Sequence, residues 1–126
     1  MKILTLLSLL AISNIAEARS ILASWYDHGK VTANGDKFNP DGLTAAHKTL
    51  PFGTLLKLRY GVKVITVRVN DRGPFIGRRE LDLSRGAARR IGLTGVDTLE
   101  VLRVIKPKLE KRKWLTLKIG WVKKKP

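Results

Sequence analysis

The segments 54–60 (TLLKLRY) and 65–69 (ITVRV) alternate between apolar and polar residues with a period of two. Such alternation is typical of β-strands that bury one face and expose the other to water. Gly61 separates the two segments and supplies a residue suited to a tight turn. The pattern therefore predicts a β-hairpin, and its second strand leads directly into the polar segment NDRGPF, residues 70–75.

Other short apolar runs along the chain predict further strands. They cover residues 21–26, 81–83, 99–105 and 115–122. One helix is expected over residues 85–91, where Ser84 can cap its start and Gly92 can end it. About six short strands with one or two short helices predict a mostly β fold, a small barrel.

Polar, glycine-containing clusters interrupt the predicted strands. They are TANGD (32–36), TAAHKTLPFGT (44–54), NDRGPF (70–75) and, after them, LDLS (81–84). The core of a small barrel does not require such residues in a row. Because loops at strand ends commonly carry binding and catalytic residues, we interpret these clusters as parts of one functional site.

The first 18 residues have the pattern of a secretory signal peptide. Lys2 precedes an apolar run over residues 3–12, and small residues flank Glu17 at a predicted cleavage site after Ala18. The run is shorter than the roughly 20 residues of a transmembrane helix. A buried N-terminal helix is the alternative. We therefore expect a signal peptide (1–18), a barrel domain (19–105) and a basic extension (106–126) that includes the strand predicted over 115–122.

The chain carries a formal net charge of +15 and no cysteine. An exported protein without cysteine has neither a lipid-attachment site nor disulfides, so we expect a soluble periplasmic or secreted protein that is not a lipoprotein. The basic extension could contact anionic wall polymer or a membrane surface, although a generally basic surface explains the charge equally well. We expect a monomer, no nucleic-acid partner and no cofactor.

Three carboxylates, Asp36, Asp71 and Asp82, lie at predicted turns or strand ends. Glycosidic bond cleavage needs a proton donor and a charge that stabilises an oxocarbenium-like state, and two neighbouring carboxyl groups meet both needs. The alternative is structural: aspartates in such turns often cap backbone groups or form ion pairs. Arg72 follows Asp71, and a guanidinium close to a carboxylate lowers its pKa, which suits a base or an electrostatic stabiliser better than an acid.

Two further kinds of side chain fit a sugar-binding site. His47 lies among polar residues and could hydrogen-bond a sugar or orient a carboxylate. Tyr26 and Phe75 adjoin the polar clusters and could stack on sugar rings, although aromatic side chains pack in cores by default. The spacing of histidines and carboxylates suggests no metal site, and no serine has the pattern of a nucleophile.

The segments ASWYDHGKVTANGDKF, LTAAHKTLPFGTLLKL, VRVNDRGPFIGR and LDLSRGAARRIGL together resemble the RlpA-like (rare lipoprotein A-like) domain of septal ring lytic transglycosylases. The resemblance covers about residues 23–104. It implies a six-stranded double-psi β-barrel that acts on peptidoglycan. The implied reaction is endolytic cleavage of the MurNAc–GlcNAc bond by the sugar's own C6 hydroxyl, which gives a 1,6-anhydro product.

The resemblance assigns catalytic roles to Asp36, Asp71 and His47. The substrate-binding residues expected around them are Tyr26, Thr32, Asn34, Arg72, Phe75 and Asp82. The family usually has glutamate at the position of Asp36, and this difference leaves open a non-catalytic, expansin-like protein that binds or loosens the cell wall.

Overall fold

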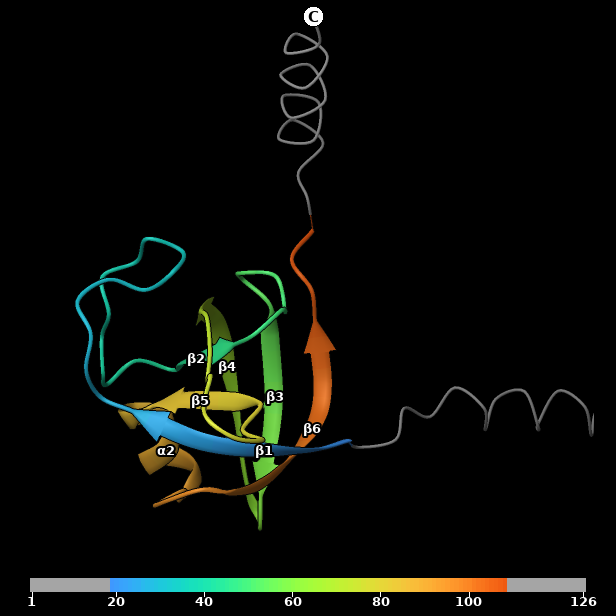
Figure 1. Ribbon diagram of the computed structural model, residues 1–126. Coiled ribbons are helices and arrows are strands. Elements are labelled where there is room, and N and C mark those ends of the chain that lie inside the picture. The colour runs from blue at the N-terminus through green and yellow to red at the C-terminus, as the bar shows by residue number, and fades with distance from the viewer. Residues whose placement is uncertain (1–18, 109–126) are drawn as a thin grey trace, which may run out of the picture.

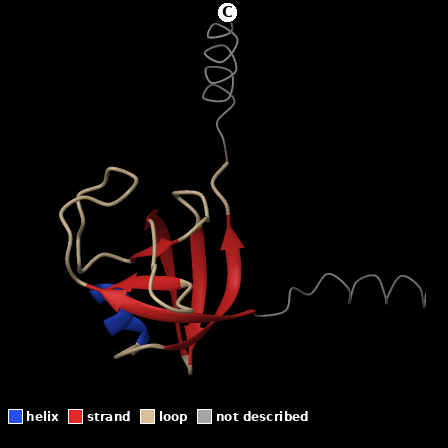
Figure 2. Ribbon diagram, in the orientation of Figure 1, coloured by secondary structure: helices blue, strands red, loops and turns tan. Residues whose placement is uncertain are grey.

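The structure is a computed structural model that describes residues 19–108. Its elements are β1 (Arg19–Tyr26), β2 (Thr44–His47), β3 (Leu55–Tyr60), β4 (Lys63–Asp71), β5 (Leu81–Ser84), α2 (Arg85–Ile91) and β6 (Asp97–Ile105). The six strands close into a barrel in the order β1-β5-β2-β4-β3-β6 (Figures 1 and 2). The predicted fold class, a mostly β six-stranded barrel with a short helix, is confirmed.

The barrel contains two parallel strand pairs, β1 with β5 and β2 with β4, and its other neighbours are antiparallel. Parallel neighbours cannot be joined by a tight hairpin, so the chain crosses between them through long connections. The longest loop within residues 19–108 covers residues 27–43 and joins β1 to β2, which are not paired because β5 lies between them (Figure 1). This connection carries one of the polar clusters of the sequence.

The hairpin predicted from the alternating pattern is formed by β3 and β4. Leu56 pairs with Val67 and Leu58 with Ile65, and Gly61 takes a φ of 62° at the turn. These four side chains are at most 7% exposed and belong to one barrel core. The alternation thus fixed which face of the hairpin is buried, because shifting the register by one residue would turn these side chains to the solvent.

The helix α2 begins and ends at the predicted residues. The Ser84 hydroxyl accepts a hydrogen bond from the backbone N–H of Ala87, and Gly92 ends the helix in the left-handed conformation at φ 84°. Ala87, Ala88 and Ile91 pack into the core cluster. None of the helices within residues 19–108 is long and apolar enough to cross a membrane.

Two predicted segments lie outside the described residues: the signal peptide over 1–18 and the strand over 115–122. The six strands of the barrel therefore all come from residues 19–105. The strand β2 lies within residues 43–48, a segment for which the sequence pattern predicted no strand.

Gly86 in α2 allows the C-terminal part of the long loop to pack closely against the helix. Its backbone N–H donates to the carbonyl of Pro40 at 2.7 Å. A Cβ atom at this position would lie 2.6 Å from the carbonyl carbon of Asp41 and 2.8 Å from its Cα. Both are backbone atoms, so a side chain can be accommodated only if the loop moves.

We expect Gly86→Ala to lower the free energy of unfolding by about 1–3 kcal/mol, the usual range for overpacking. The matched control is Gly95→Ala, where a Cβ would meet nothing within 4 Å. Urea denaturation of both variants measures the difference. Equal stability of the two variants would contradict the close approach of loop and helix.

Candidate active site

The strand register brings two of the predicted carboxylates into one row across four strands. Ser24 on β1 pairs with Asp82 on β5, Asp82 pairs with Ala46 on β2, and Ala46 pairs with Asp71 on β4. Paired residues in neighbouring strands point to the same face of a sheet. Asp71 and Asp82 therefore flank Ala46, which is buried.

A β-bulge at the end of β4 sets this arrangement. Ala45 pairs with Val69, but the next residue of β2, Ala46, pairs with Asp71, so Asn70 is the extra residue of β4. Without the bulge, Ala46 would face Asn70 and Asp71 would be displaced from the row. The bulge thus aims both the Asn70 and the Asp71 side chains at the site.

Both carboxylate oxygens of Asp71 accept hydrogen bonds. Oδ1 accepts from the backbone N–H groups of Ala33 and Arg72, each at 2.9 Å. Oδ2 accepts from the hydroxyl of Tyr26 at 3.0 Å. Burial, followed by the charge of Asp71, raises the pKa of Tyr26 far above its ordinary value, so this phenol remains a donor at physiological pH.

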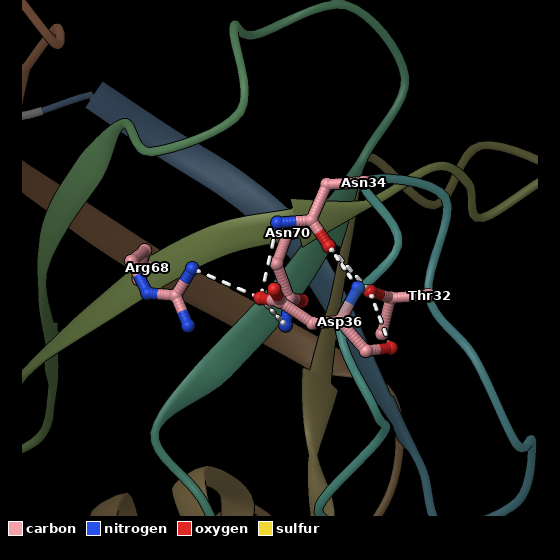
Figure 3. Close-up of polar contacts among 5 residues, drawn as sticks. All are labelled: Thr32, Asn34, Asp36, Arg68 and Asn70. Carbon is pink, nitrogen blue, oxygen red and sulfur yellow. Dashed lines mark hydrogen bonds and ion pairs between the residues drawn. The ribbon is translucent and has the colours of Figure 1, made fainter.

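Asp36 lies in a different polar environment (Figure 3). Its Oδ2 accepts from the Asn34 side-chain amide at 3.0 Å, from the Arg68 guanidinium at 3.1 Å and from the Asn70 amide at 3.5 Å. The Asn34 hydrogen bond and then the Arg68 contact hold the pKa of Asp36 below its ordinary value. The side chain of Asp36 is 41% exposed, so its charge can still reach a ligand.

One tight loop, residues 32–36, connects these two environments. The Thr32 N–H donates to the Asp36 carbonyl at 2.9 Å, and Gly35 supplies a φ of 93° that a residue with a side chain rarely adopts. From this loop Ala33 binds the Asp71 carboxylate, and the Asn34 N–H donates to the carbonyl of Asn70 at 3.2 Å. The loop that carries Asp36 therefore contacts the end of β4 at Asn70 and Asp71, and a cleft shared by Asp36 and Asp71 stays a prediction.

The structure gives two of the predicted substrate-binding residues a role inside this loop. The Thr32 hydroxyl donates to the Asn34 side-chain oxygen at 2.6 Å, and that oxygen also accepts from the Asp36 N–H at 3.0 Å. Thr32 is only 4% exposed. Both side chains thus hold the backbone that presents Asp36, and a direct contact with substrate stays a prediction.

His47 lines a groove of about 380 Å³ that is separate from the groove beside Asp36 described below. The other residues of this groove include Arg19, Glu80 and the apolar Leu56 and Val101. Its Nδ1 accepts from the backbone N–H groups of Thr49 and Leu50 at 3.1 and 3.0 Å, so Nε2 carries the proton of the neutral ring. Burial, and then the charge of Arg72, lower the pKa of His47. The groove that Asp36 lines does not include His47.

Among residues 19–108, Asp71 and Arg72 form no ion pair. The Arg72 guanidinium turns away from Asp71, donates to the carbonyls of His47 at 3.2 Å and Leu50 at 2.9 Å, and lies 3.9 Å from the centre of the Phe52 ring. Burying a guanidinium against carbonyls and an aromatic face anchors the turn after β2. The arginine that contacts a site carboxylate is Arg68, which pairs with Asp36.

The remaining predicted residues differ in exposure. The Asp82 carboxylate is half-buried and accepts from the Ser24 hydroxyl at 3.0 Å, and burial raises its pKa. Tyr26 stacks on Phe38 with ring centres 4.8 Å apart, so its ring is engaged within the protein. Phe75 is 79% exposed on the loop after β4 and is free to stack on a ligand.

An open groove of about 480 Å³ adjoins Asp36. It is lined by Asp36, Lys37, Asn39, Gly42, Leu43, Thr44, Arg68 and Asn70. Thr44 and Asn70 belong to the polar clusters of the sequence but were not predicted individually as site residues, and Arg68 was not predicted at all. Arg68 had one detectable signal, since it occupies a polar position of an alternating strand that ends in the cluster. Among residues 19–108 no group of three or more histidine or acidic side chains is placed to hold a metal ion.

A closed six-stranded barrel with two parallel pairs and a polar site at the strand ends defines a double-psi β-barrel domain. The chain belongs to the family described as "Lytic transglycolase", whose model matches residues 18–103. The resemblance stated from the sequence motifs is therefore confirmed.

Curated relatives agree with this family. The chain is 55% identical over 89 residues to the "Probable endolytic peptidoglycan transglycosylase RlpA" of Synechocystis sp., which covers 66% of this chain and 27% of the relative. It is 48% identical over 92 residues to the "Endolytic peptidoglycan transglycosylase RlpA" of Campylobacter jejuni, covering 69% of this chain and 34% of the relative. The chain thus spans about a third or less of these relatives.

A solved structure shows the same fold. The "Streptomyces papain inhibitor (SPI)" aligns with a TM-score of 0.52 at 22% sequence identity, over 71% of this chain and 98% of that chain. At this identity the likeness concerns the fold alone.

We expect Arg68→Gln to raise the pKa of Asp36 toward its ordinary value, because the variant removes the guanidinium beside Oδ2. A lowered pKa stabilises the fold above the carboxylate's unfolded pKa, and this stability is lost as the pH falls through the folded pKa. The variant should therefore lose less stability on acidification. NMR titration of the carboxyl carbons measures the pKa directly.

The matched control is Arg59→Gln, which changes the net charge equally but removes a partner of Glu100 instead. An Asp36 pKa that responds alike to both variants would show that overall charge, and not the Arg68 contact, sets it.

Proposed function

We propose that this domain is an endolytic lytic transglycosylase that cleaves the MurNAc–GlcNAc bond of peptidoglycan strands and leaves 1,6-anhydro ends. Support comes from membership in the family and from the printed names of its relatives. The observation that carries the proposal is the loop over residues 32–36, which binds Asp71 through Ala33 and presents Asp36 at the same strand end. A barrel needs no such loop for its own stability.

Asp36 is proposed to act as the ionised carboxylate. Its Asn34 and Arg68 contacts keep the pKa low, so the group is negative at the pH of the cell wall. A fixed negative charge near the anomeric carbon stabilises the positive charge that develops on the sugar ring in the transition state. Because Arg68 also fixes the position of the carboxylate, little reorganisation is needed during the reaction.

Asp71 is proposed to act first as the general acid and then as the general base. As the C1–O bond breaks, its carboxyl group gives a proton to the departing glycosidic oxygen. The resulting carboxylate then takes the proton of the C6 hydroxyl as O6 bonds to C1, which restores the carboxyl group without water. The hydroxyl of Tyr26 and the N–H of Ala33 hold Asp71 in place through both steps.

His47 is proposed to act as a positioning residue. Its ring binds the backbone of the turn over residues 47–50, and the carbonyls of this turn hold the guanidinium of Arg72. Asp71 precedes Arg72 in the chain. By holding Arg72, the turn therefore stabilises the strand end that carries the proton-transfer group. The exposed ring of Phe75 is proposed to stack on a sugar of the strand.

The location of the protein is part of the proposal. We propose that residues 1–18 direct export, that the mature protein is a periplasmic or secreted monomer, and that the basic residues of 106–126 contact anionic wall polymer. Sedimentation with isolated sacculi tests this contact: a chain that lacks residues 106–126 should stay in the supernatant at a salt concentration where the full chain sediments.

We expect Asp71→Asn and Asp36→Asn each to reduce the rate of glycan strand cleavage by about 10²–10⁴-fold, because each removes a group that acts in the transition state. Mass spectrometry of digested strands detects the anhydro-ended products. The control is Asp97→Asn, an exposed carboxylate at the start of β6.

Wild-type protein that binds strands but yields no anhydro ends would contradict the proposal and favour a wall-binding protein. Full activity of Asp71→Asn would overturn the role assigned to that carboxyl group.

A further inference from the structure

Two side-chain oxygen atoms in the groove beside Asp36 are buried without a hydrogen-bond partner within the described residues. They are Thr44 Oγ1 and Asn70 Oδ1. Both residues line this groove, and Asn70 is only 3% exposed. Buried polar atoms in folded proteins almost always have partners, so an unpaired acceptor at the wall of a groove indicates a ligand contact.

The orientation of the Asn70 amide follows from its neighbour. Nδ2 faces the Asp36 carboxylate at 3.5 Å, as Figure 3 shows. The opposite orientation would place the amide oxygen against a carboxylate oxygen, two acceptors without a proton between them. Oδ1 is therefore the free end of this side chain, and it can only accept a hydrogen bond.

Thr44 complements this acceptor. It pairs with Arg68 in the β2–β4 register, so its side chain lies on the same face of the sheet as the guanidinium that holds Asp36. A threonine hydroxyl can donate as well as accept. The groove thus offers an acceptor from Asn70 and a donor from Thr44, next to the carboxylate proposed to stabilise the transition state.

We propose that Asn70 and Thr44 form a subsite for the acetamido group of an amino sugar. The amide N–H of the sugar donates to Asn70 Oδ1, and its carbonyl accepts from the Thr44 hydroxyl. A secondary amide is the common sugar substituent that presents both groups together. The inference rests on the proposed function, since it names a determinant of substrate choice at that same site.

The test compares Thr44→Val, which keeps the shape and removes the hydroxyl, with Thr44→Ser, which keeps the hydroxyl. The substrates are intact glycan strands and strands whose acetamido groups have been removed chemically. We expect Thr44→Val to raise KM on intact strands about fivefold to tenfold, the usual effect of one lost hydrogen bond, with kcat little changed. Thr44→Ser should stay within about twofold of wild type.

Two comparisons identify the group that is recognised. On de-N-acetylated strands, wild type and Thr44→Val should have equal KM values, because this substrate has no acetyl carbonyl for the Thr44 hydroxyl to bind. The matched control is Thr66→Val on the exposed face of β4, which should behave as wild type on both substrates. The melting temperature of Thr44→Val should not fall, because the hydroxyl has no hydrogen-bond partner among residues 19–108.

An unchanged KM of Thr44→Val on intact strands, or an equal increase on both substrates, would overturn the acetamido subsite. Loss of stability in Thr44→Val would also overturn it, since the hydroxyl would then serve the fold. A different result would show that the proposed function is wrong while the acetamido subsite is right. Wild-type protein would then bind N-acetylated chito-oligomers in preference to their de-N-acetylated forms, but it would produce no anhydro ends from glycan strands.

Discussion

The hydrogen bond from the Ala33 N–H to the Asp71 carboxylate is the contact on which the site depends. With the bond from Asn34 to the Asn70 carbonyl, it docks the loop over residues 32–36 onto the end of β4. A backbone N–H bonded to a charged group makes one of the stronger hydrogen bonds in proteins. The same contact that orients Asp71 therefore also helps to position the loop that carries Asp36.

The barrel makes this contact possible by its order of strands. Because β2 lies between β4 and β5, and β5 lies next to β1, residues from four distant parts of the chain reach one row: Ser24, Asp82, Ala46 and Asp71. The long loop after β1 passes over this face and is fixed at its other end by Gly86 against the backbone of Asp41. Fold and site are thus joined by backbone contacts, which leave the carboxylates accessible to a ligand.

Much of the fold could be predicted because its signals are local. Alternation over two segments defined the hairpin, and the cap at Ser84 with the left-handed Gly92 defined the helix. The site was less predictable from the residues alone. The motifs drew attention to Asp36 and Asp71, but their convergence depends on the bulge at Asn70 and on strand register, and neither leaves a local signal.

The environment of Arg72 was not predictable from its neighbour Asp71, because its guanidinium binds carbonyls and an aromatic face of the turn after β2. Arg68, three residues before Asp71, reaches a carboxylate from another loop instead.

The most direct test of a single shared site is a double-mutant cycle on kcat/KM for glycan strands, with Asp36→Asn, Asp71→Asn and both together. If the two carboxylates act as one unit, the double variant should lose little more activity than the worse of the two single variants. Losses that multiply, as they do for independent positions, would contradict a common site at the end of β4.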